Sequence, residues 1–377
     1  MNGLLIAVPS LGRAGPDKVM ATVASQLASR GWDVALAIGD GARDLVATLD
    51  ERVRVLDVPS AGPRLHRRYP VFGLARVLRQ EQPDVVLATL RMESTVALAA
   101  RMSRSRAKVV SRPANHGPSV EKQLGRSPKY RLAFALSRWG LLRSEGVISQ
   151  CEALADVVRG LGYDGPLAVI GNPVAPGAAD VDAVRLAGEP CLVGVGRLTN
   201  QKGFDVAVKA LPEIVSHFPR TVLHLVGDGP DREALGDLAA RHGVAEHVVF
   251  HGGRSDVVAA IKGADLLVAP SRYEGFSNVI LEAQSVGTPV VATSCPGAAR
   301  DVLDHTGGGV VVAPDNADEL AAAVVGLLAE PDRFDRAIIA DRTAERWSAD
   351  RIAAEYDRFL SEVSDRHDGV TSEVPHG

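Results

Sequence analysis

The 377-residue sequence has few cysteines, few aromatic residues and no long apolar run. Its three cysteines, Cys151, Cys191 and Cys295, are far apart and form no C-x-x-C pair, which argues against a disulfide framework and a cysteine-based metal site. No apolar stretch approaches the roughly 20 residues that a membrane-spanning helix requires. Because Met1–Val8 has neither a basic region before its apolar run nor a cleavage site, it predicts a first strand rather than a signal peptide. We therefore expect a cytoplasmic protein without a structural metal.

The composition that remains is that of a globular protein, with 46% apolar and 23% charged residues. The length suits two α/β domains of similar size. Residues 1–172 hold 24 Lys and Arg against 15 Asp and Glu, whereas residues 173–377 hold 18 against 31. A basic half of this kind favours anions such as lipid phosphates or nucleic acid, although a solvated basic surface explains it equally well.

Short apolar runs alternate with helical patterns along the chain, which predicts parallel strands joined by crossover helices. The pattern pauses in a Pro-, Gly- and Ala-rich stretch before residue 190, which we interpret as an interdomain linker. The expected strands are 4–8, 33–38, 84–88, 108–111, 146–149, 167–170, 191–195, 221–226, 247–250, 265–269, 289–292 and 309–312. The expected helices include 18–30, 205–218, 231–242 and 278–286.

This alternation predicts an α/β protein of two doubly wound, Rossmann-like domains that face each other across a cleft. Ligands of such sheets bind outside the carboxyl ends of the strands, so the cleft is the expected site of chemistry. The predicted divisions are a first domain over 1–172, a linker over 173–190, a second domain over 191–343, a final helix over 344–362 and a disordered tail over 363–377.

Two cations follow the first strand of the second half, in the segment VGVGRLTNQKGFDVAVKAL (193–211). Gly196 allows a close turn, and Arg197 and Lys202 stand in the loop before a helix that begins near Asp205. A guanidinium fork, an ammonium group and free helix amides are typical of a diphosphate site, although two unrelated surface cations have the same spacing. A dinucleotide fingerprint is excluded, because its third glycine is missing and the helix begins elsewhere.

Two carboxylates flank a helix start in the segment APSRYEGFSNVILEAQSVGTPVVAT (269–293). Glu274 ends a strand, Ser277 can cap the helix, and Glu282 lies in its first turns. Free amides over residues 275–278 suit a phosphate, and ionised carboxylates accept hydrogen bonds from sugar hydroxyls. An ordinary surface glutamate at 282 and a plain cap at 277 are the alternative.

The first half offers weaker candidates. Gly12 and Gly15 lie in a loop between strand and helix, where backbone can approach a ligand from across the cleft. Arg112, Asn115 and His116 follow a strand at the level where active-site groups sit. A structural or solvated histidine is the alternative at 116.

Together these segments resemble the retaining glycosyltransferases of family 4, which have the two-domain GT-B fold. The resemblance rests on GRLTNQKGFD, LVGDGPDREAL, VVFHGGRSDV, the segment that contains Glu274 and Glu282, and GGGVVVAPDNADELAAAV, in the family's order and spacing. It covers essentially all of 190–330, with the glycine loop, QPDVV and GNPV in the first half. It implies that the final helices, around 347–360, cross back to pack on the first domain.

Carried over residue by residue, the resemblance implies a nucleotide-sugar site, with a UDP-sugar as the expected donor. Arg197 and Lys202 would hold the diphosphate, Glu282 the ribose and Glu274 the transferred sugar. The implied donor-binding residues are Gly15, Gly196, Arg197, Lys202, Gly227, Arg254, Glu274, Gly275, Phe276, Ser277, Asn278 and Glu282. The implied catalytic residues are His116, Arg197, Lys202 and Glu274, and the acceptor-side candidates are Arg112, Asn115 and His116.

The resemblance further implies retaining, metal-independent transfer of a hexose or N-acetylhexosamine to a glycan or lipid-linked acceptor, in cell-envelope or exopolysaccharide synthesis. No cofactor is expected besides the nucleotide-sugar co-substrate. The basic segment 64–79 suggests peripheral binding to an anionic membrane.

Two rival functions remain open. Sugar-nucleotide 2-epimerases share this architecture but lack the Glu-x7-Glu pair. The second rival is a catalytically inactive nucleotide-sugar-binding protein, against which the intact set of Arg197, Lys202, Glu274 and Glu282 argues. Nucleic-acid binding is not expected, because the sequence has no recognition module or pattern of stacking aromatics.

Overall fold

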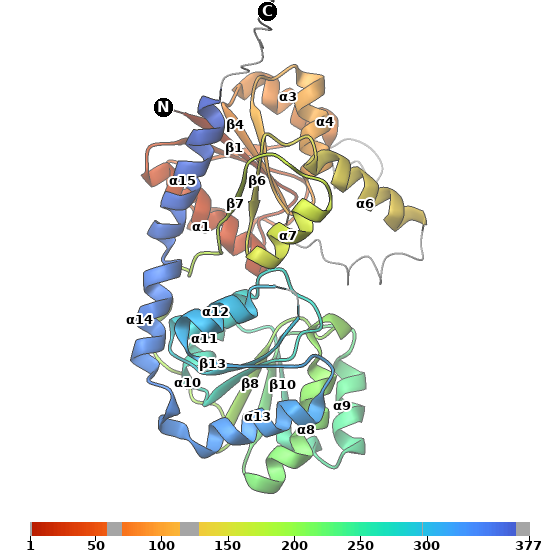
Figure 1. The fold of residues 1–377 in the computed structure, drawn as a ribbon, viewed down its shortest axis with the longest axis vertical. Coiled ribbons are helices and arrows are strands. Elements are labelled where there is room, and N and C mark those ends of the chain that lie inside the picture. The colour runs from red at the N-terminus through yellow and green to blue at the C-terminus, as the bar shows by residue number, and fades with distance from the viewer. Residues whose placement is uncertain (1, 59–69, 114–127, 296, 367–377) are drawn as a thin grey trace, which may run out of the picture.

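The computed structural model describes residues 2–58, 70–113, 128–295 and 297–366. Two α/β domains lie one above the other, each built around a parallel sheet (Figure 1). The first sheet has the strand order β3-β2-β1-β4-β5-β6-β7. Its strands are β1 (Gly3–Val8), β2 (Asp33–Ile38), β3 (Arg54–Asp57), β4 (Val85–Thr89), β5 (Lys108–Arg112), β6 (Gly146–Ser149) and β7 (Leu167–Val169). Its helices are α1 (Gly15–Ser29), α3 (Val71–Glu81), α4 (Glu93–Ser103), α6 (Pro128–Leu141) and α7 (Glu152–Gly160).

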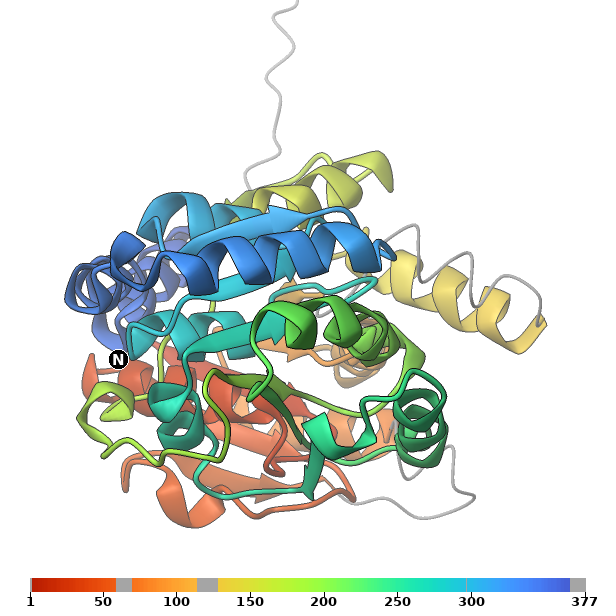
Figure 2. The ribbon, with the colours of Figure 1, turned by 90° about the horizontal axis from the view of Figure 1, so that it is seen from below.

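The second sheet has the strand order β10-β9-β8-β11-β12-β13. Its strands are β8 (Cys191–Val195), β9 (Val222–Val226), β10 (Val248–Gly252), β11 (Leu266–Ala269), β12 (Val290–Thr293) and β13 (Gly309–Val312). Its helices are α8 (Phe204–His217), α9 (Arg232–Arg241), α10 (Val257–Gly263), α11 (Asn278–Ser285), α12 (Ala299–Thr306) and α13 (Ala317–Ala329). Figure 2 shows α8 and α13 side by side on this sheet.

These strand orders confirm the predicted α/β fold with two doubly wound sheets. Every strand expected from the sequence is present, with bounds that differ by at most two residues. The edge strand β3 was not among the expected strands. Among the described strands it pairs only with β2, and it has charged residues at both ends, Arg54 and Asp57. An edge strand with only two central apolar residues carries too little hydrophobic pattern to be recognised.

Burial on both faces of the sheet explains the continuous apolar runs. In β1, Leu4, Ile6 and Val8 belong to the core cluster that includes α1 and the C-terminal helix, whereas Leu5 and Ala7 belong to the cluster with α3 and α4. Successive side chains of a strand point to opposite faces, so a strand between two helical layers needs apolar residues at every position.

The last two helices connect the domains. α14 (Arg336–Trp347) packs on α11 and α12, and α15 (Ala349–Asp365) packs on α1 of the first domain. Figure 1 shows both along one side of the molecule, which confirms the predicted return of the C-terminal helix. Where they meet, the carbonyl of Trp347 accepts from the N–H of Val174 at 2.8 Å, so the two interdomain connections touch. Among the helices described, none is both long and apolar enough to cross a membrane.

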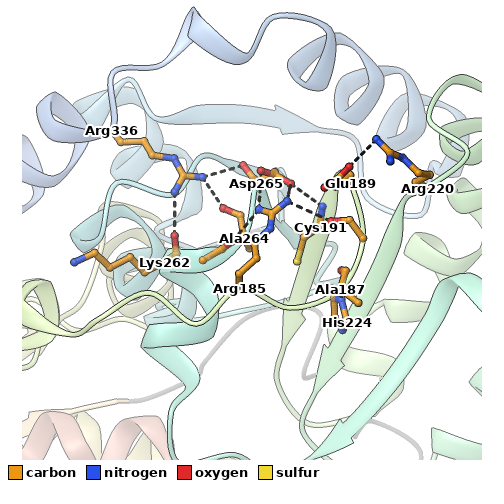
Figure 3. A network of polar contacts seen from close by, with 12 residues as sticks. Arg185, Ala187, Glu189, Cys191, Arg220, His224, Lys262, Ala264, Asp265 and Arg336 are labelled. Carbon is orange, nitrogen blue, oxygen red and sulfur yellow. Dashed lines mark hydrogen bonds and ion pairs between the residues drawn. The ribbon is translucent and has the colours of Figure 1, made fainter.

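Asp265 fastens the linker to the second domain (Figure 3). Its carboxylate accepts from both terminal nitrogens of Arg185, at 2.8 and 2.9 Å, and from the N–H of Cys191 at 2.7 Å. Beside it, Arg336 at the start of α14 donates to the carbonyls of Lys262 and Ala264. Both chain segments that leave the second domain are therefore held at the amino edge of its sheet, on the opposite side from the strand ends where ligands bind.

Candidate donor-binding site

Two glycine turns lie in contact at the carboxyl ends of β8 and β9. Gly196 and Gly227 adopt φ angles of 150° and 138°, which side chains rarely tolerate. The N–H of Gly196 donates to the carbonyl of Val226 at 2.9 Å, and a Cβ added to Gly227 would lie 2.0 Å from the carbonyl oxygen of Gly196. Both positions therefore need glycine, and the turns leave backbone open to a ligand at the strand ends.

Lys202 and Glu274 meet beside these turns. Nζ of Lys202 pairs with Oε1 of Glu274, which also accepts from Oγ of Ser271 at 3.1 Å. The Lys202 chain lies over Gly196, because a Cβ there would come within 3.0 Å of its Cε. The two side chains are 20% and 11% exposed. An ammonium group has three donors, and Oε2 of Glu274 has no hydrogen-bond partner among the described residues, so the pair can still bind a ligand.

The start of α11 lies next to Glu274. Ser277 occupies its N-cap position, but its side chain makes no capping hydrogen bond, contrary to the sequence-based expectation. The φ and ψ angles of Ser277, −81° and 95°, are extended, as is usual at an N-cap, yet the first amides of α11 have no side-chain cap. Sγ of Cys151, in the first domain, lies 3.7 Å from the carbonyl oxygen of Gly275. Phe276 approaches Gly171, since a Cβ there would lie 3.4 Å from its Cε2.

The start of α1 faces α11 from the other domain. A Cβ added to Gly15 would lie 2.6 Å from Nδ2 of Asn278, so only glycine fits without displacing that amide. Glu282 follows Asn278 by one helical turn and is partly buried. Burial raises its pKa, and the positive charges of Lys18 and Lys202 oppose the rise. Lys18 was missed in the sequence, where its only signal was its position one turn after Gly15 in α1.

The two predicted arginines differ in their surroundings. Arg197 is exposed and forms no ion pair with the described residues. Arg254 is held by Asp256, with contacts of 2.8 and 2.5 Å that raise the pKa of the guanidinium. Its Nη1 also lies 3.4 Å from Nδ1 of His251, whose Nε2 is 2.9 Å from Nδ1 of the buried His224. These contacts connect Arg254 to His224, which lies in β9.

The structure does not place Arg112 on an open acceptor surface. Its side chain is 2% exposed and donates to Tyr356 and Asn172, because β5 ends under α15. The other acceptor-side candidates, Asn115 and His116, lie outside the described residues, as do 64–69 of the basic segment and the tail after 366. Within the described part of the chain, no cluster of three or more His, Cys, Asp or Glu could hold a metal ion.

Both halves of the chain match models of known protein families. Residues 14–177 match the family model Glycosyltransferase Family 4, and residues 189–330 match Glycosyl transferases group 1. The chain belongs to these glycosyltransferase families. Together the two matches cover most of both domains.

The curated relatives include bacterial glycosyltransferases. A GDP-mannose-dependent alpha-(1-6)-phosphatidylinositol monomannoside mannosyltransferase of Mycolicibacterium smegmatis is 39% identical over 174 residues, 44% of each chain. A lipopolysaccharide core biosynthesis glycosyltransferase, LpsE of Rhizobium meliloti, is 31% identical over 54% of this chain and 62% of its own. The chain thus spans about half the length of the curated relatives it matches.

Solved structures share the whole fold. A sucrose-phosphate synthase from Thermosynechococcus elongatus superposes with a TM-score of 0.80 at 20% identity, over 96% of this chain and 99% of its own. HepE of Anabaena, in complex with UDP and glucose, gives 0.76 at 20% identity over 96% and 100%. These likenesses establish the GT-B fold.

Proposed function

We propose that this protein transfers a hexose or N-acetylhexosamine from a nucleotide sugar to a glycan or lipid-linked acceptor, with retention of the anomeric configuration and without a metal ion. The pairing of Lys202 with Glu274, between the turn at Gly196 and the start of α11, carries the proposal. A cation, a carboxylate and uncapped helix amides lie together there. A diphosphate and a sugar hydroxyl therefore find complementary partners side by side.

In this mechanism the bond between the anomeric carbon and the diphosphate oxygen breaks, and negative charge develops on the diphosphate. Arg197, Lys202 and the amides of α11 stabilise that charge. The acceptor hydroxyl forms the new glycosidic bond on the face from which the diphosphate leaves, and its proton passes to a diphosphate oxygen. Because Lys202 is shared with Glu274, sugar and diphosphate are held by one connected pair of side chains.

For the base of the donor, family resemblance favours uridine, and the mannosyltransferase relatives named as GDP-mannose-dependent favour guanosine. A thermal-shift screen of UDP- and GDP-sugars separates the two, because a bound donor raises the unfolding temperature by mass action. Incubation with the stabilising donor alone then tests the epimerase alternative, which requires an isomerised nucleotide sugar as product.

The decisive test is Lys202→Ala, with donor binding and sugar transfer both measured. Removal of a preorganised charge stabiliser should lower the transfer rate by roughly a hundredfold or more. Lys209→Ala is the matched control, because Lys209 pairs with Asp205 on the exposed side of α8 and should transfer at the wild-type rate. Transfer by Lys202→Ala at the wild-type rate would remove the proposal.

We further propose that the first domain binds an anionic membrane at α6, which would bring the protein to a lipid-linked acceptor. Leu132 and Leu136, one turn apart on α6, are 63% and 44% exposed, and Arg131 and Arg138 are exposed on the same helix. Figure 1 shows α6 extending away from the domain. Apolar and basic side chains on one exposed helix are typical of binding to the membrane surface. Vesicles with anionic lipid should sediment wild-type protein at low salt and less of Leu132→Asp; equal sedimentation would refute the membrane proposal.

A further inference from the structure

A chain of three hydrogen bonds joins the C-terminal helix to the start of α11. Nε of Arg112 donates to the hydroxyl of Tyr356 on α15 at 2.7 Å, and its Nη2 donates to Oδ1 of Asn172 at 2.5 Å. Nδ2 of Asn172 then donates to Oδ1 of Asn278 at 2.5 Å. Arg112, Asn172 and Tyr356 are at most 5% exposed, so water does not compete for these bonds. The chain crosses from the first domain to the second.

The chemistry of the guanidinium fixes the direction of every bond in this chain. Arginine only donates, so the atom of Asn172 that faces Arg112 must be its carbonyl oxygen. The amide nitrogen of Asn172 therefore faces Asn278 and must find an acceptor there, which is Oδ1 of Asn278. With Oδ1 engaged, Nδ2 of Asn278 points to the other side. A permanent charge thus sets the orientation of two neutral amides, neither of which prefers an orientation by itself.

The free end of this chain lies between the starts of α11 and α1. Nδ2 of Asn278 faces Gly15 of the first domain, where a Cβ would approach it to 2.6 Å, and it has no acceptor among the described residues. Asn278 is also the first residue of α11, whose initial amides have no side-chain cap. The side-chain N–H groups and the helix amides form one set of donors at one place, and such a set favours an anion.

We propose that Arg112 and Asn172 are positioning residues that hold Asn278 with its N–H groups, rather than its oxygen, toward the diphosphate of the donor. This inference rests on the function proposed above and assigns a role to two residues that do not touch the donor themselves. It predicts that the orientation of Asn278, and not only its presence, determines how tightly the diphosphate is bound.

The test is Asn172→Asp, assayed by calorimetric binding of UDP and of GDP. Aspartate still accepts from Arg112 but has no N–H to give, so Asn278 turns its own N–H groups to the new carboxylate and presents its oxygen to the diphosphate. We expect the nucleoside diphosphate to bind roughly ten- to a hundredfold more weakly, the effect of a lost hydrogen bond to a charged group. Asn172→Ala, which leaves Asn278 free to turn, should lose less.

Two comparisons separate positioning from mere stability. Asp357→Ala breaks another contact of α15 with the first domain, in which Asp357 accepts from Trp32 at 2.8 Å. This control should lower the unfolding temperature and leave diphosphate affinity unchanged. Arg112→Lys keeps a donor-only group against Asn172 and should retain affinity, whereas Arg112→Gln should lose it.

The outcomes separate the positioning role from the proposed function. If Asn172→Asp and Arg112→Gln fold and bind like wild type while Lys202→Ala binds weakly, the positioning role is refuted and the proposed function stands. The same refutation follows if the Asp357→Ala control weakens binding as much as Asn172→Asp. If wild-type protein binds neither UDP nor GDP, the proposed function fails, and the positioning role fails with it.

Discussion

Glu93 gives the sharpest quantitative prediction, because it is a carboxyl group with no exposed surface at the start of α4. Its Oε2 accepts from Oγ of Ser137 on α6 at 3.3 Å, and its Oε1 has no hydrogen-bond partner. Burial raises the pKa of Glu93 from 4.5 to about 7. We predict that stability falls as pH rises, and that Glu93→Gln removes this part of the pH dependence.

The sign and size follow from the two pKa values. The unfolded chain loses the Glu93 proton near pH 4.5 and the folded chain only near pH 7, so the folded state is progressively disfavoured between these values. A difference of this size corresponds to about 3 kcal/mol in total, of which about 2.5 kcal/mol falls between pH 5 and pH 8. Above the folded pKa the penalty is complete and constant.

The assay is urea denaturation of wild type and Glu93→Gln at pH 5, 6, 7 and 8. The stability of wild type relative to the variant should decline by about 2.5 kcal/mol across this range. Taking the difference removes the other titrating groups, among them Asp17, whose pKa burial raises to about 6. Parallel curves for the two proteins would show that Glu93 does not hold its proton in the fold, and would refute the reasoning.

Three further predictions concern the second domain. Gly227→Ala should cost at least about 1–3 kcal/mol in urea denaturation, because its φ of 138° and its contact with the carbonyl of Gly196 exclude a Cβ; wild-type stability would contradict this. Asp265→Ala should lower stability by roughly 2 kcal/mol through loss of the Arg185 and backbone contacts, and an unchanged denaturation midpoint would argue against linker anchoring there. Burial lowers the pKa of His224, so the unfolded chain takes up its proton first and wild type should lose stability as pH falls below 6.5; His224→Gln should lose less, and equal losses would refute it.

The positions of the strands could be predicted because burial on both faces of a sheet produces continuous apolar runs in the sequence. A strand between two helical layers must be apolar throughout, and each helix between strands carries its own periodicity. The edge strand β3 has no such requirement and was missed. The cap at Ser277 was expected from residue type, but a serine at an N-cap position caps only if its backbone and neighbours orient the hydroxyl, which sequence does not specify.

The candidate site was predictable where its residues are close in sequence and not where they are distant. The segment with Glu274 and Glu282 surrounds one helix start, so local geometry alone brings carboxylates and amides together. Lys18 and Asn172 were missed. Asn172 stands in GNPV, which contributed to the resemblance but received no role of its own, and Lys18 had no signal besides its place one turn after Gly15. Arg112 was assigned to the acceptor by its position at a strand end, whereas α15 covers it in the structure.

The sequence by itself determined two parallel α/β domains, the glycine turns and the helix start with its flanking carboxylates, since each depends on residues within one or two neighbouring elements. Only the tertiary structure decided that Arg112 meets Tyr356, 244 positions away, and that Gly15 faces Asn278. Such contacts depend on how two domains and a returning helix pack. That packing is the sum of many weak apolar contacts spread over the whole chain, and no single segment encodes it.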